Sequence, residues 1–581
     1  MNNDTTSRLK GIPASPGIIL GKARVIDRSR VKILYQYLIN KKQVNLEVER
    51  FKEAVRAAKE HIGELRGRMP DPLKAHGFIL DTHLMILDDS MLSEATVKTI
   101  LEEKINAEWA LKRSVQRIQK LFSQIEDTYL RERVNDVENV AQIILRNLAG
   151  KEPASLSEIN ERVIIVAHDL SPIDTSEMNI GKVMGFITDV GGRTSHTAIM
   201  AQAMKLPAVV GLESATQAIA DGTLLIVDGH TGEIIINPDD DTIIEYQERQ
   251  IAHEKHASSI LRLSHLPAET LDHQSLCIKA NIEFPEEVAL ALDHGAEGIG
   301  LYRTEFLYLR NRDLPSEEEM FENYREVAEI IAPKPVTIRT LDLGGDKFSS
   351  TLPLGREMNP ALGLRAIRFC LREKTIFKNQ LRAILRASAF GRVRLMFPMI
   401  SGIQEVLDGR GILSEVMTEL DREGLAYNPD IKVGIMIEIP SAVTVADLLA
   451  RHVDFFSIGT NDLIQYALAI DRINEHVAYM YQPFHPAILR MIRQVTLAAG
   501  EAGIDVSLCG EMAGDPACAG LLVGLGLREL SMNASSIPGV KEAIRSLSAE
   551  EAVADIEEIF KLSTSQEVRE FMNRKKGLNA C

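Results

Sequence analysis

The sequence predicts a multidomain α/β protein that ends in a closed, TIM-like (β/α)8 barrel. Eight apolar, strand-like runs in the C-terminal half end in polar residues and alternate with helical segments, as such a barrel requires. A helical stretch between two strand-rich segments precedes that half. At 581 residues the chain is also too long for a single hydrophobic core.

The N-terminal region alternates between strand-like and helical patterns. Glycine and proline residues punctuate the start, around the apolar run Ile18–Ile26. From about Val44 to Leu148, apolar residues recur at three- and four-residue spacing, which indicates a helical bundle. Compact apolar runs then return at Val163–Ala167, Val183–Thr188, Ala208–Gly211 and Leu224–Val227. We expect these runs and the N-terminal strands to form one small α/β domain, with the helical block inserted.

The polar, helix-prone stretch from Asp239 to Leu263 is predicted to form a connecting helix. The expected domains are therefore an α/β domain at 1–35 and 150–238, a helical domain at 36–149, a linker helix at 239–265 and a barrel at 266–575.

The predicted barrel strands end at polar positions. In order, they finish at Ala280–Asn281, Tyr302–Arg303, Ile338–Arg339, Met396–Phe397, Ile437–Glu438, Ile458–Asn461, Leu508–Cys509 and Leu530–Asn533. In a (β/α)8 barrel the active site lies at the C-terminal ends of the strands, so these polar groups are expected to meet at one mouth. An open doubly wound sheet is the alternative, and it explains fewer of the polar strand ends.

Composition limits the partners and the compartment. A formal net charge of −16 argues against bulk binding to nucleic acid or anionic lipid. No apolar run is long enough for a membrane span, and the start of the chain does not resemble a signal peptide. Five widely spaced cysteines without a CxxC pair fit free thiols in a reducing compartment. We therefore expect a cytoplasmic protein that does not insert into membranes.

Three arginines follow predicted barrel strands, namely Arg303, Arg339 and Arg472. A guanidinium group offers paired donors that match phosphate or carboxylate oxygens, so arginines that converge indicate an anionic substrate. The alternative is that each arginine pairs with a neighbouring carboxylate. The candidate partners for such pairs are Glu305, Asp342 and Asp471.

Glu438 and Asp462 follow adjacent predicted strands, and such carboxylates suit Mg²⁺, which leaves other positions to water and substrate phosphate. The alternative role for both is to balance the arginines. Cys509 lies where an acid could deliver a proton, although a cysteine is more often a small buried hydrophobe.

His196 lies in a glycine-rich turn after a predicted strand. Gly191 and Gly192 permit a tight turn, Thr194 or Ser195 is a suitable N-cap, and a helix is predicted to follow. The N-terminus of a helix stabilises a negative group, and a phosphorylated imidazole is such a group. A general base or an anion-binding turn remains an alternative role for this histidine.

These motifs together resemble enzyme I of the bacterial phosphoenolpyruvate:sugar phosphotransferase system. The resemblance extends over nearly the whole chain. It is carried by Ser15–Gly17, Gly191–Met200, Gly300–Phe306, Arg339–Lys347, Asn359–Arg368, Phe397–Met399, Asp454–Arg472 and Cys509–Glu511.

The resemblance implies that phosphoenolpyruvate binds in the barrel with Mg²⁺ and phosphorylates His196, which passes the phosphoryl group to a histidine of the carrier protein HPr and so drives sugar uptake. It assigns the phosphate to Arg303, Arg339, Arg472 and Asn461, and the metal to Glu438 and Asp462. Asp462 thus also lies in the substrate site. Cys509 would protonate the enolate, releasing pyruvate.

The resemblance also implies interactions with protein partners. Thr175 matches a threonine that contacts the active histidine. The helical domain would dock HPr through the block from Phe78 to Asp89, where apolar residues are rimmed by aspartates. The family dimerises through its barrel, so a homodimer is expected.

Two enzymatic alternatives share the histidine and barrel modules. Pyruvate phosphate dikinase and phosphoenolpyruvate synthase also carry a large ATP-grasp domain, for which the helical stretch before the histidine unit is too short. A nitrogen-branch enzyme I usually adds an N-terminal sensory domain. The non-catalytic alternative is a scaffold that keeps the fold without the chemistry.

Overall fold

A computed structural model of the chain divides into two compact units, Met1–His256 and Ala257–Cys581. The residues that it describes are 6–26, 38–40, 43–67, 78–88, 90–123, 128–150, 161–170, 174, 178, 181–192, 195–309, 314–344, 359–471 and 477–575.

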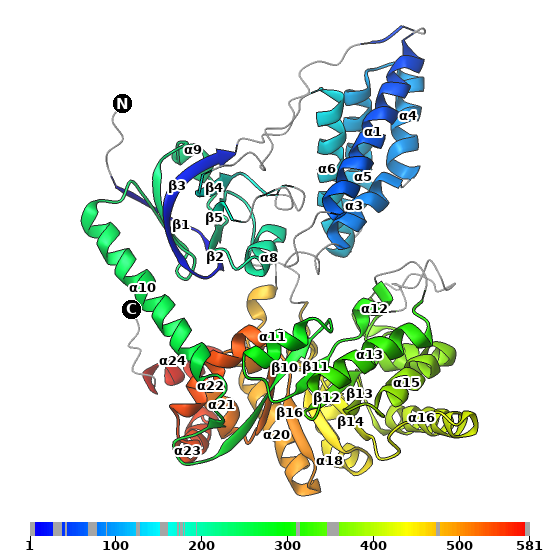
Figure 1. Cartoon of the computed structure of the whole chain (residues 1–581), viewed down its shortest axis with the longest axis vertical. Coiled ribbons are helices and arrows are strands. Elements are labelled where there is room, and N and C mark those ends of the chain that lie inside the picture. Colours follow the sequence, from blue (N-terminus) through cyan, green and yellow to red (C-terminus); the bar gives the residue numbers. More distant parts are fainter. Residues whose placement is uncertain are drawn as a thin grey trace. The chain divides into compact units, whose positions relative to one another are not determined.

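The first unit contains an eight-stranded sheet in the order β1-β8-β7-β3-β4-β5-β6-β2. Figure 1 labels β1 to β5 of this sheet. Its strands are β1 (Ser7–Lys10), β2 (Ile12–Ser15), β3 (Ile18–Ile26), β4 (Val163–Ala167), β5 (Val183–Thr188), β6 (Ala208–Val210), β7 (Leu224–Asp228) and β8 (Glu233–Ile236). β3 pairs with β4 in parallel and with β7 in antiparallel register, so the N-terminal strands complete the sheet as predicted. The sequence interpretation missed β8, which pairs with β7 through a tight turn.

Five described helices separate β3 from β4 in the chain. They are α1 (Val44–Gly67), α3 (Phe78–Asp88), α4 (Ser90–Glu103), α5 (Ala107–Ser123) and α6 (Thr128–Leu148). α1 packs against α3, α4 and α6, and its buried stripe includes Phe51, Ala58 and Ile62. The helical periodicity of this region therefore gives the bundle that it predicts.

The second unit is a closed barrel of eight parallel strands. They are β10 (Ser275–Ile282), β11 (Ile299–Tyr302), β12 (Pro335–Arg339), β13 (Arg392–Phe397), β14 (Lys432–Ile437), β15 (Phe455–Ile458), β16 (Asp505–Leu508) and β17 (Glu529–Met532). β10 pairs in parallel with both β11 and β17, which closes the ring, and the short β9 (Ala268–Glu269) adds an antiparallel strand to β10. All eight predicted barrel strands are present.

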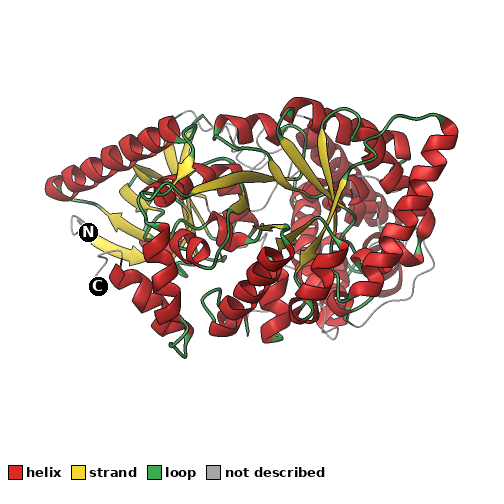
Figure 2. Ribbon diagram, turned by 90° about the horizontal axis from the view of Figure 1, so that it is seen from below, coloured by secondary structure: helices red, strands yellow, loops and turns green. Residues whose placement is uncertain are grey.

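Helices lie outside these strands (Figure 2). They are α11 (Glu287–Asp293), α12 (Glu305–Leu309), α13 (Glu317–Ile331), α14 (Ala366–Arg372), α15 (Lys374–Ala387), α16 (Ile403–Glu423), α17 (Pro440–Thr444), α18 (Ala446–Leu449), α19 (Thr460–Leu468), α20 (Pro486–Ala502), α21 (Ala519–Gly524), α22 (Ile537–Arg545), α23 (Ala549–Ile559) and α24 (Ser565–Lys575). Strand residues alternate between this outer layer and the barrel interior. The interior holds a small apolar cluster of Leu301, Met396, Met436, Phe455 and Cys509.

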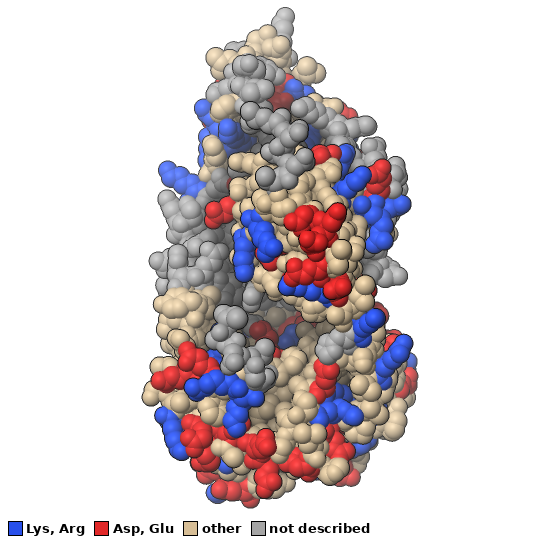
Figure 3. All heavy atoms as spheres, turned by 90° about the vertical axis from the view of Figure 1, so that its left-hand side faces the viewer, with Lys and Arg blue, Asp and Glu red and all other residues tan. Residues whose placement is uncertain are grey.

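Three further helices are α8 (His196–Ala203), α9 (Ala215–Ala218) and α10 (Asp240–Leu263). α10 contains the boundary between the units, and its Tyr246 is buried against Ile18, Ile226 and Ile235 of the first sheet. Among the described residues, no helix is both long and apolar enough to span a membrane. Acidic and basic side chains lie interspersed in small groups on the face in Figure 3.

Candidate active site

The C-terminal ends of the barrel strands bring charged side chains together at the mouth of the second unit. Arg339 is the last residue of β12, Glu438 follows β14, and Asp462 lies in the first turn of α19 after β15. Arg303 follows β11. Four of the residues predicted for the mouth therefore lie at strand ends of the barrel, as the predicted fold requires.

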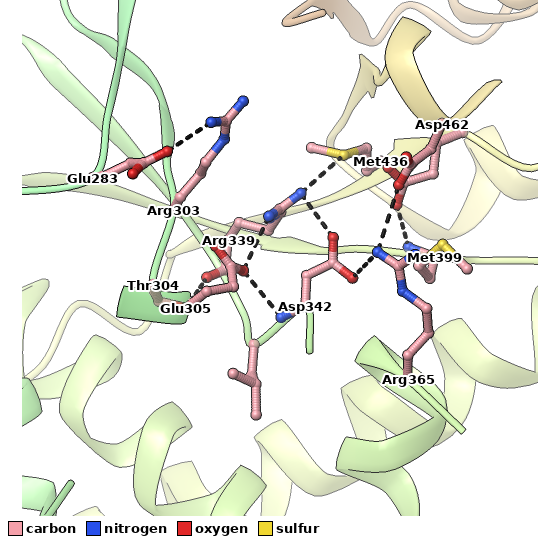
Figure 4. A network of polar contacts seen from close by, with 12 residues as sticks. Glu283, Arg303, Thr304, Glu305, Arg339, Asp342, Arg365, Met399, Met436 and Asp462 are labelled. Carbon is pink, nitrogen blue, oxygen red and sulfur yellow. Dashed lines mark hydrogen bonds and ion pairs between the residues drawn. The ribbon is translucent and has the colours of Figure 1, made fainter. Parts of the chain in front are cut away.

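Arg339 is buried and pairs with two carboxylates. Its guanidinium nitrogens lie 3.0 Å from a carboxylate oxygen of Glu305 and 3.0 Å from one of Asp342 (Figure 4). For Arg339, the structure thus shows the ion pairs with neighbouring carboxylates that the sequence analysis gave as the alternative to substrate binding. The Nε of Arg339 is buried and has no hydrogen-bond partner among the described residues.

Burial and charge act in opposite directions on this cluster. Burial lowers the pKa of Arg339, but Glu305 and Asp342 outweigh it and raise the pKa above its ordinary value. Burial likewise raises the pKa of Asp342, but Arg339 and Arg365 outweigh it and hold the pKa low. At Glu305 the effect of burial is larger than that of Arg339, and the pKa is raised. The arginines therefore remain charged at any physiological pH.

Arg365 is a member of the site that the strand-end argument did not identify. Its guanidinium lies 2.8 Å from a carboxylate oxygen of Asp342 and 3.6 Å from one of Asp462, and it donates to the Tyr466 hydroxyl at 3.3 Å. It thus links the strand-end carboxylates across the mouth. Arg365 directly precedes α14 rather than following a strand, so only its place in the Asn359–Arg368 stretch signalled it.

Glu438 is almost fully buried, with 2% of its surface exposed. One carboxylate oxygen accepts the backbone N–H of Met399 at 2.6 Å. Burial, and then the negative charges of Asp342 and Asp462, raise the pKa of Glu438 to about 8. Burial and the neighbouring carboxylates therefore disfavour the charged form of Glu438, which a bound cation would stabilise.

Two further predicted residues contact carboxylates that follow an adjacent strand. Arg303 lies 2.7 Å from a carboxylate oxygen of Glu283 and points away from Arg339 (Figure 4). The Asn461 side chain donates to the Glu511 carboxylate at 3.1 Å and accepts the Glu511 N–H at 2.9 Å. Asn461 therefore joins the loops after β15 and β16 at the mouth.

Cys509 lies just inside the mouth, with 4% of its surface exposed. Its thiol packs in the apolar interior cluster with Leu301, Met396 and Met436. Burial raises the pKa of this thiol above its ordinary value. The thiol is therefore held in its protonated form, which is the form that donates a proton.

The predicted helix after the glycine turn is α8, and it begins at His196. Ser195 is its N-cap, and the Ser195 hydroxyl accepts the backbone N–H of Ala198. Gly191 has a φ of +119°, a conformation that side-chain-bearing residues rarely adopt. Thr197 donates to the Leu170 carbonyl at 3.1 Å, which ties the first turn of α8 to the segment after β4. His196 therefore lies at the start of a capped and anchored helix.

The strand that leads into this turn ends in a buried carboxylate. Asp189 accepts the backbone N–H of Thr216 at 3.0 Å and also bonds the Thr216 hydroxyl. The imidazole Nδ1 of His168 lies 3.2 Å from the same carboxylate. These contacts fix the end of β5, two residues before Gly191.

Three family descriptions match consecutive parts of the chain. Residues 10–133 match the N-terminal region of PEP-utilising enzymes, and residues 159–232 match their mobile domain. Residues 258–549 match the PEP-binding domain of PEP-utilising enzymes. The order of these three regions follows the order of bundle, histidine unit and barrel in the structure.

Relatives align with the chain over almost its full length. It is 42% identical over 570 residues to the phosphoenolpyruvate-protein phosphotransferase of Priestia megaterium, which covers 98% of this chain and 99% of that protein. It is 44% identical over 568 residues to the phosphoenolpyruvate-protein phosphotransferase of Bacillus subtilis (strain 168), which covers 97% and 99%. The chain belongs to the phosphoenolpyruvate-protein phosphotransferase family. This confirms the resemblance and favours neither the dikinase nor the nitrogen-branch alternative.

A solved structure titled as an NMR solution structure of Enzyme I (nEIt) is also similar to part of the chain. It is 37% identical, has a TM-score of 0.38, and covers 42% of this chain and 99% of that chain.

Not every residue predicted for a member of the phosphoenolpyruvate-protein phosphotransferase family can be placed. Thr175 and Arg472 lie outside the described residues, and so does the side chain of His196. The expected docking block falls on α3, where Met85 is half-exposed and Leu80 and Leu87 are buried. The barrel mouth therefore carries most of the structural support for the predicted site.

Proposed function

We propose that this chain transfers the phosphoryl group of phosphoenolpyruvate to His196 and then to a histidine of HPr, releasing pyruvate. One observation carries the proposal: the chain aligns over almost its full length with phosphoenolpyruvate-protein phosphotransferases. The same chain has a charged barrel mouth and a histidine at the start of a capped helix. Membership of this family gives the reaction class, and the geometry supports the residue roles proposed below.

The arginines of the mouth hold the phosphate and carboxylate of the substrate. The buried Nε of Arg339 has no partner among the described residues, and Arg303 is exposed enough to exchange Glu283 for a substrate oxygen. Asn461 and Arg472 complete this set in the proposal. The substrate thus replaces contacts that the arginines now make with carboxylates.

Glu438 and Asp462 are the proposed ligands of Mg²⁺. In the described part of the chain, no group of three or more His, Cys, Asp or Glu side chains is arranged to hold a metal. Two carboxylates suffice for Mg²⁺, because water and substrate phosphate supply its remaining oxygens. The raised pKa of Glu438 fits this role, since burial and nearby carboxylates disfavour its charged form and a bound cation would favour it. When bound, Mg²⁺ would neutralise charge on the phosphoryl group.

Cys509 is the proposed acid, and its buried, protonated thiol supplies the proton that converts the enolate to pyruvate. His196 is the proposed acceptor of the phosphoryl group. The positive end of the dipole of α8 would stabilise the negative phosphohistidine, and Thr175 would contact the same imidazole.

The proposal assigns one role to each predicted domain. The α/β domain (1–35 and 150–238) carries the phosphohistidine, and the helical domain (36–149) docks HPr through residues 78–89. The linker helix (239–265) joins them to the barrel (266–575), which binds phosphoenolpyruvate. We further propose that the protein acts in the cytoplasm, as a homodimer formed through the barrel, and serves sugar uptake.

Incubation with ³²P-labelled phosphoenolpyruvate and Mg²⁺ tests the proposal. We expect label that is acid-labile and base-stable, that is lost in a His196→Ala variant, and that moves to HPr when HPr is added. A requirement for ATP would instead indicate a dikinase. Absence of label from the wild-type protein would refute the proposed function.

A further inference from the structure

We propose that Asn281 is a positioning residue that holds the Cys509 thiol in place for proton donation. The inference rests on the proposed function, because it assumes that Cys509 protonates the enolate. Asn281 lies on β10, near the end of the strand at the barrel mouth. The strand-end argument places Asn281 at the mouth, but neither it nor the family resemblance gives this side chain a role.

Asn281 reaches the turn that carries Cys509 from two strands away. Its Nδ2 donates to the backbone carbonyl of Cys509 at 3.0 Å. β10 pairs with β17 and β11, whereas Cys509 follows β16, so this bond crosses β17. A side chain that spans a neighbouring strand links two parts of the mouth that the backbone ladder does not join directly.

The amide of Asn281 is itself fixed in one orientation. The fully buried hydroxyl of Ser531, on β17, donates to Asn281 Oδ1 at 2.5 Å. The same Nδ2 lies 3.4 Å from the Ser531 carbonyl. Because the carbonyl oxygens of Cys509 and Ser531 can only accept, the amide nitrogen of Asn281 must face them, and the Ser531 hydroxyl then donates to Oδ1.

The other side of the Cys509 turn is fixed by β15 and α19. The Cys509 N–H donates to the Ile458 carbonyl at 3.1 Å, and a Cβ on Gly510 would lie 1.7 Å from the Thr460 hydroxyl. The N–H of Cys509 is therefore held by Ile458 and its carbonyl by Asn281. Together they set the direction of the Cα–Cβ bond, and the thiol itself contacts the Ile458 carbonyl at 3.7 Å.

The chemistry explains why this direction matters. The P–O bond of phosphoenolpyruvate breaks, the phosphoryl group forms a bond to an imidazole nitrogen of His196, and the enolate of pyruvate remains. C3 of the enolate then takes the proton of the Cys509 thiol, and the thiolate regains a proton from water. Misplacing the thiol by about 1 Å should slow the second step by up to roughly 10²-fold and spare the first.

The test measures both steps in the same single turnover. Label on His196 reports phosphoryl transfer, and a coupled assay that reads only the keto form of pyruvate reports protonation. The variants are Asn281→Ala, Ser531→Ala, which frees the amide of Asn281 without removing it, and Cys509→Ala. Ser507→Ala is the matched control, because Ser507 is also a buried barrel hydroxyl but bonds the Phe456 carbonyl instead.

We expect pyruvate to form at least about tenfold more slowly than label in Asn281→Ala, and about two- to threefold more slowly in Ser531→Ala. Cys509→Ala should uncouple the steps as well, and adding Asn281→Ala to it should have no further effect. Ser507→Ala should keep the steps coupled. Equal rates of label and pyruvate in Asn281→Ala would overturn the inference, whereas an unlabelled wild-type protein would overturn the proposed function instead.

Discussion

The barrel mouth and the His196 turn differ in the groups that can stabilise negative charge. At the mouth, buried carboxylates and guanidinium groups neutralise one another, as in the contacts of Arg339 with Glu305 and Asp342. At the turn, the helix start and the hydroxyl of Ser195 provide uncharged dipoles. In the proposed function, the mouth would bind and release an anion that exchanges with fixed charges. The turn would carry an anion that is added covalently and removed.

Removing one charge from the mouth should produce the largest effect. Arg339→Met would leave Glu305 and Asp342 buried without their shared partner, and we expect it to cost about 3–5 kcal/mol in the free energy of unfolding. Denaturant unfolding of the full chain, followed by a barrel-specific probe, measures this. Arg372→Met, whose arginine is exposed, is the matched control and should change little. A cost below about 1 kcal/mol for Arg339→Met would contradict the neutralisation argument.

Glu438→Gln should lower the activity without lowering the stability of the fold. The raised pKa of Glu438 indicates that its negative charge is unfavourable in the folded protein, so the neutral amide should not lower the free energy of unfolding. We expect His196 labelling to fall by roughly 10²–10³-fold, because the proposed metal ligand is lost. An excess of Mg²⁺ should restore part of the rate. Full activity in this variant would remove Glu438 from the site.

The His196 turn should respond more weakly, because its contributions are single hydrogen bonds. Ser195→Ala removes the N-cap of α8 and should cost about 1 kcal/mol in stability. We expect a modest fall in the labelling rate, of about tenfold or less, with no change in the affinity of the barrel for phosphoenolpyruvate. Ser195→Asp keeps a capping oxygen, and its negative charge should oppose phosphorylation while preserving the helix.

Asp189 should give the smallest effect, and one that depends on pH. Burial raises the pKa of its carboxyl, but hydrogen bonds from Thr216 and the contact with His168 outweigh burial and leave the pKa below 3.8. A lowered pKa stabilises the fold above the unfolded-state value, and this contribution is lost as the pH falls through the folded-state pKa. Asp189→Asn should therefore cost about 1 kcal/mol at neutral pH and progressively less below pH 3.8. An equal cost at about pH 3 would contradict this assignment.

The same comparison explains what the sequence could predict. Strand ends converge wherever a parallel barrel closes, so Arg339, Glu438 and Cys509 were predictable from apolar runs and their last residues. Arg365 and the short strand β8 were not, because an arginine before a helix and a four-residue strand after a tight turn have no distinctive pattern. The role of Asn281 depends on a side chain that crosses β17, and contacts of that kind are set by packing rather than by periodicity.

The central claim is that a phosphoryl group bound at the barrel mouth reaches His196. Mass-spectrometric mapping of the wild-type and Glu438→Gln proteins, after brief exposure to phosphoenolpyruvate and Mg²⁺, tests it most directly. The account predicts phosphate on the peptide that contains His196 in the wild type and far less in the variant. Phosphate on another residue, or equal occupancy of His196 in both proteins, would contradict it.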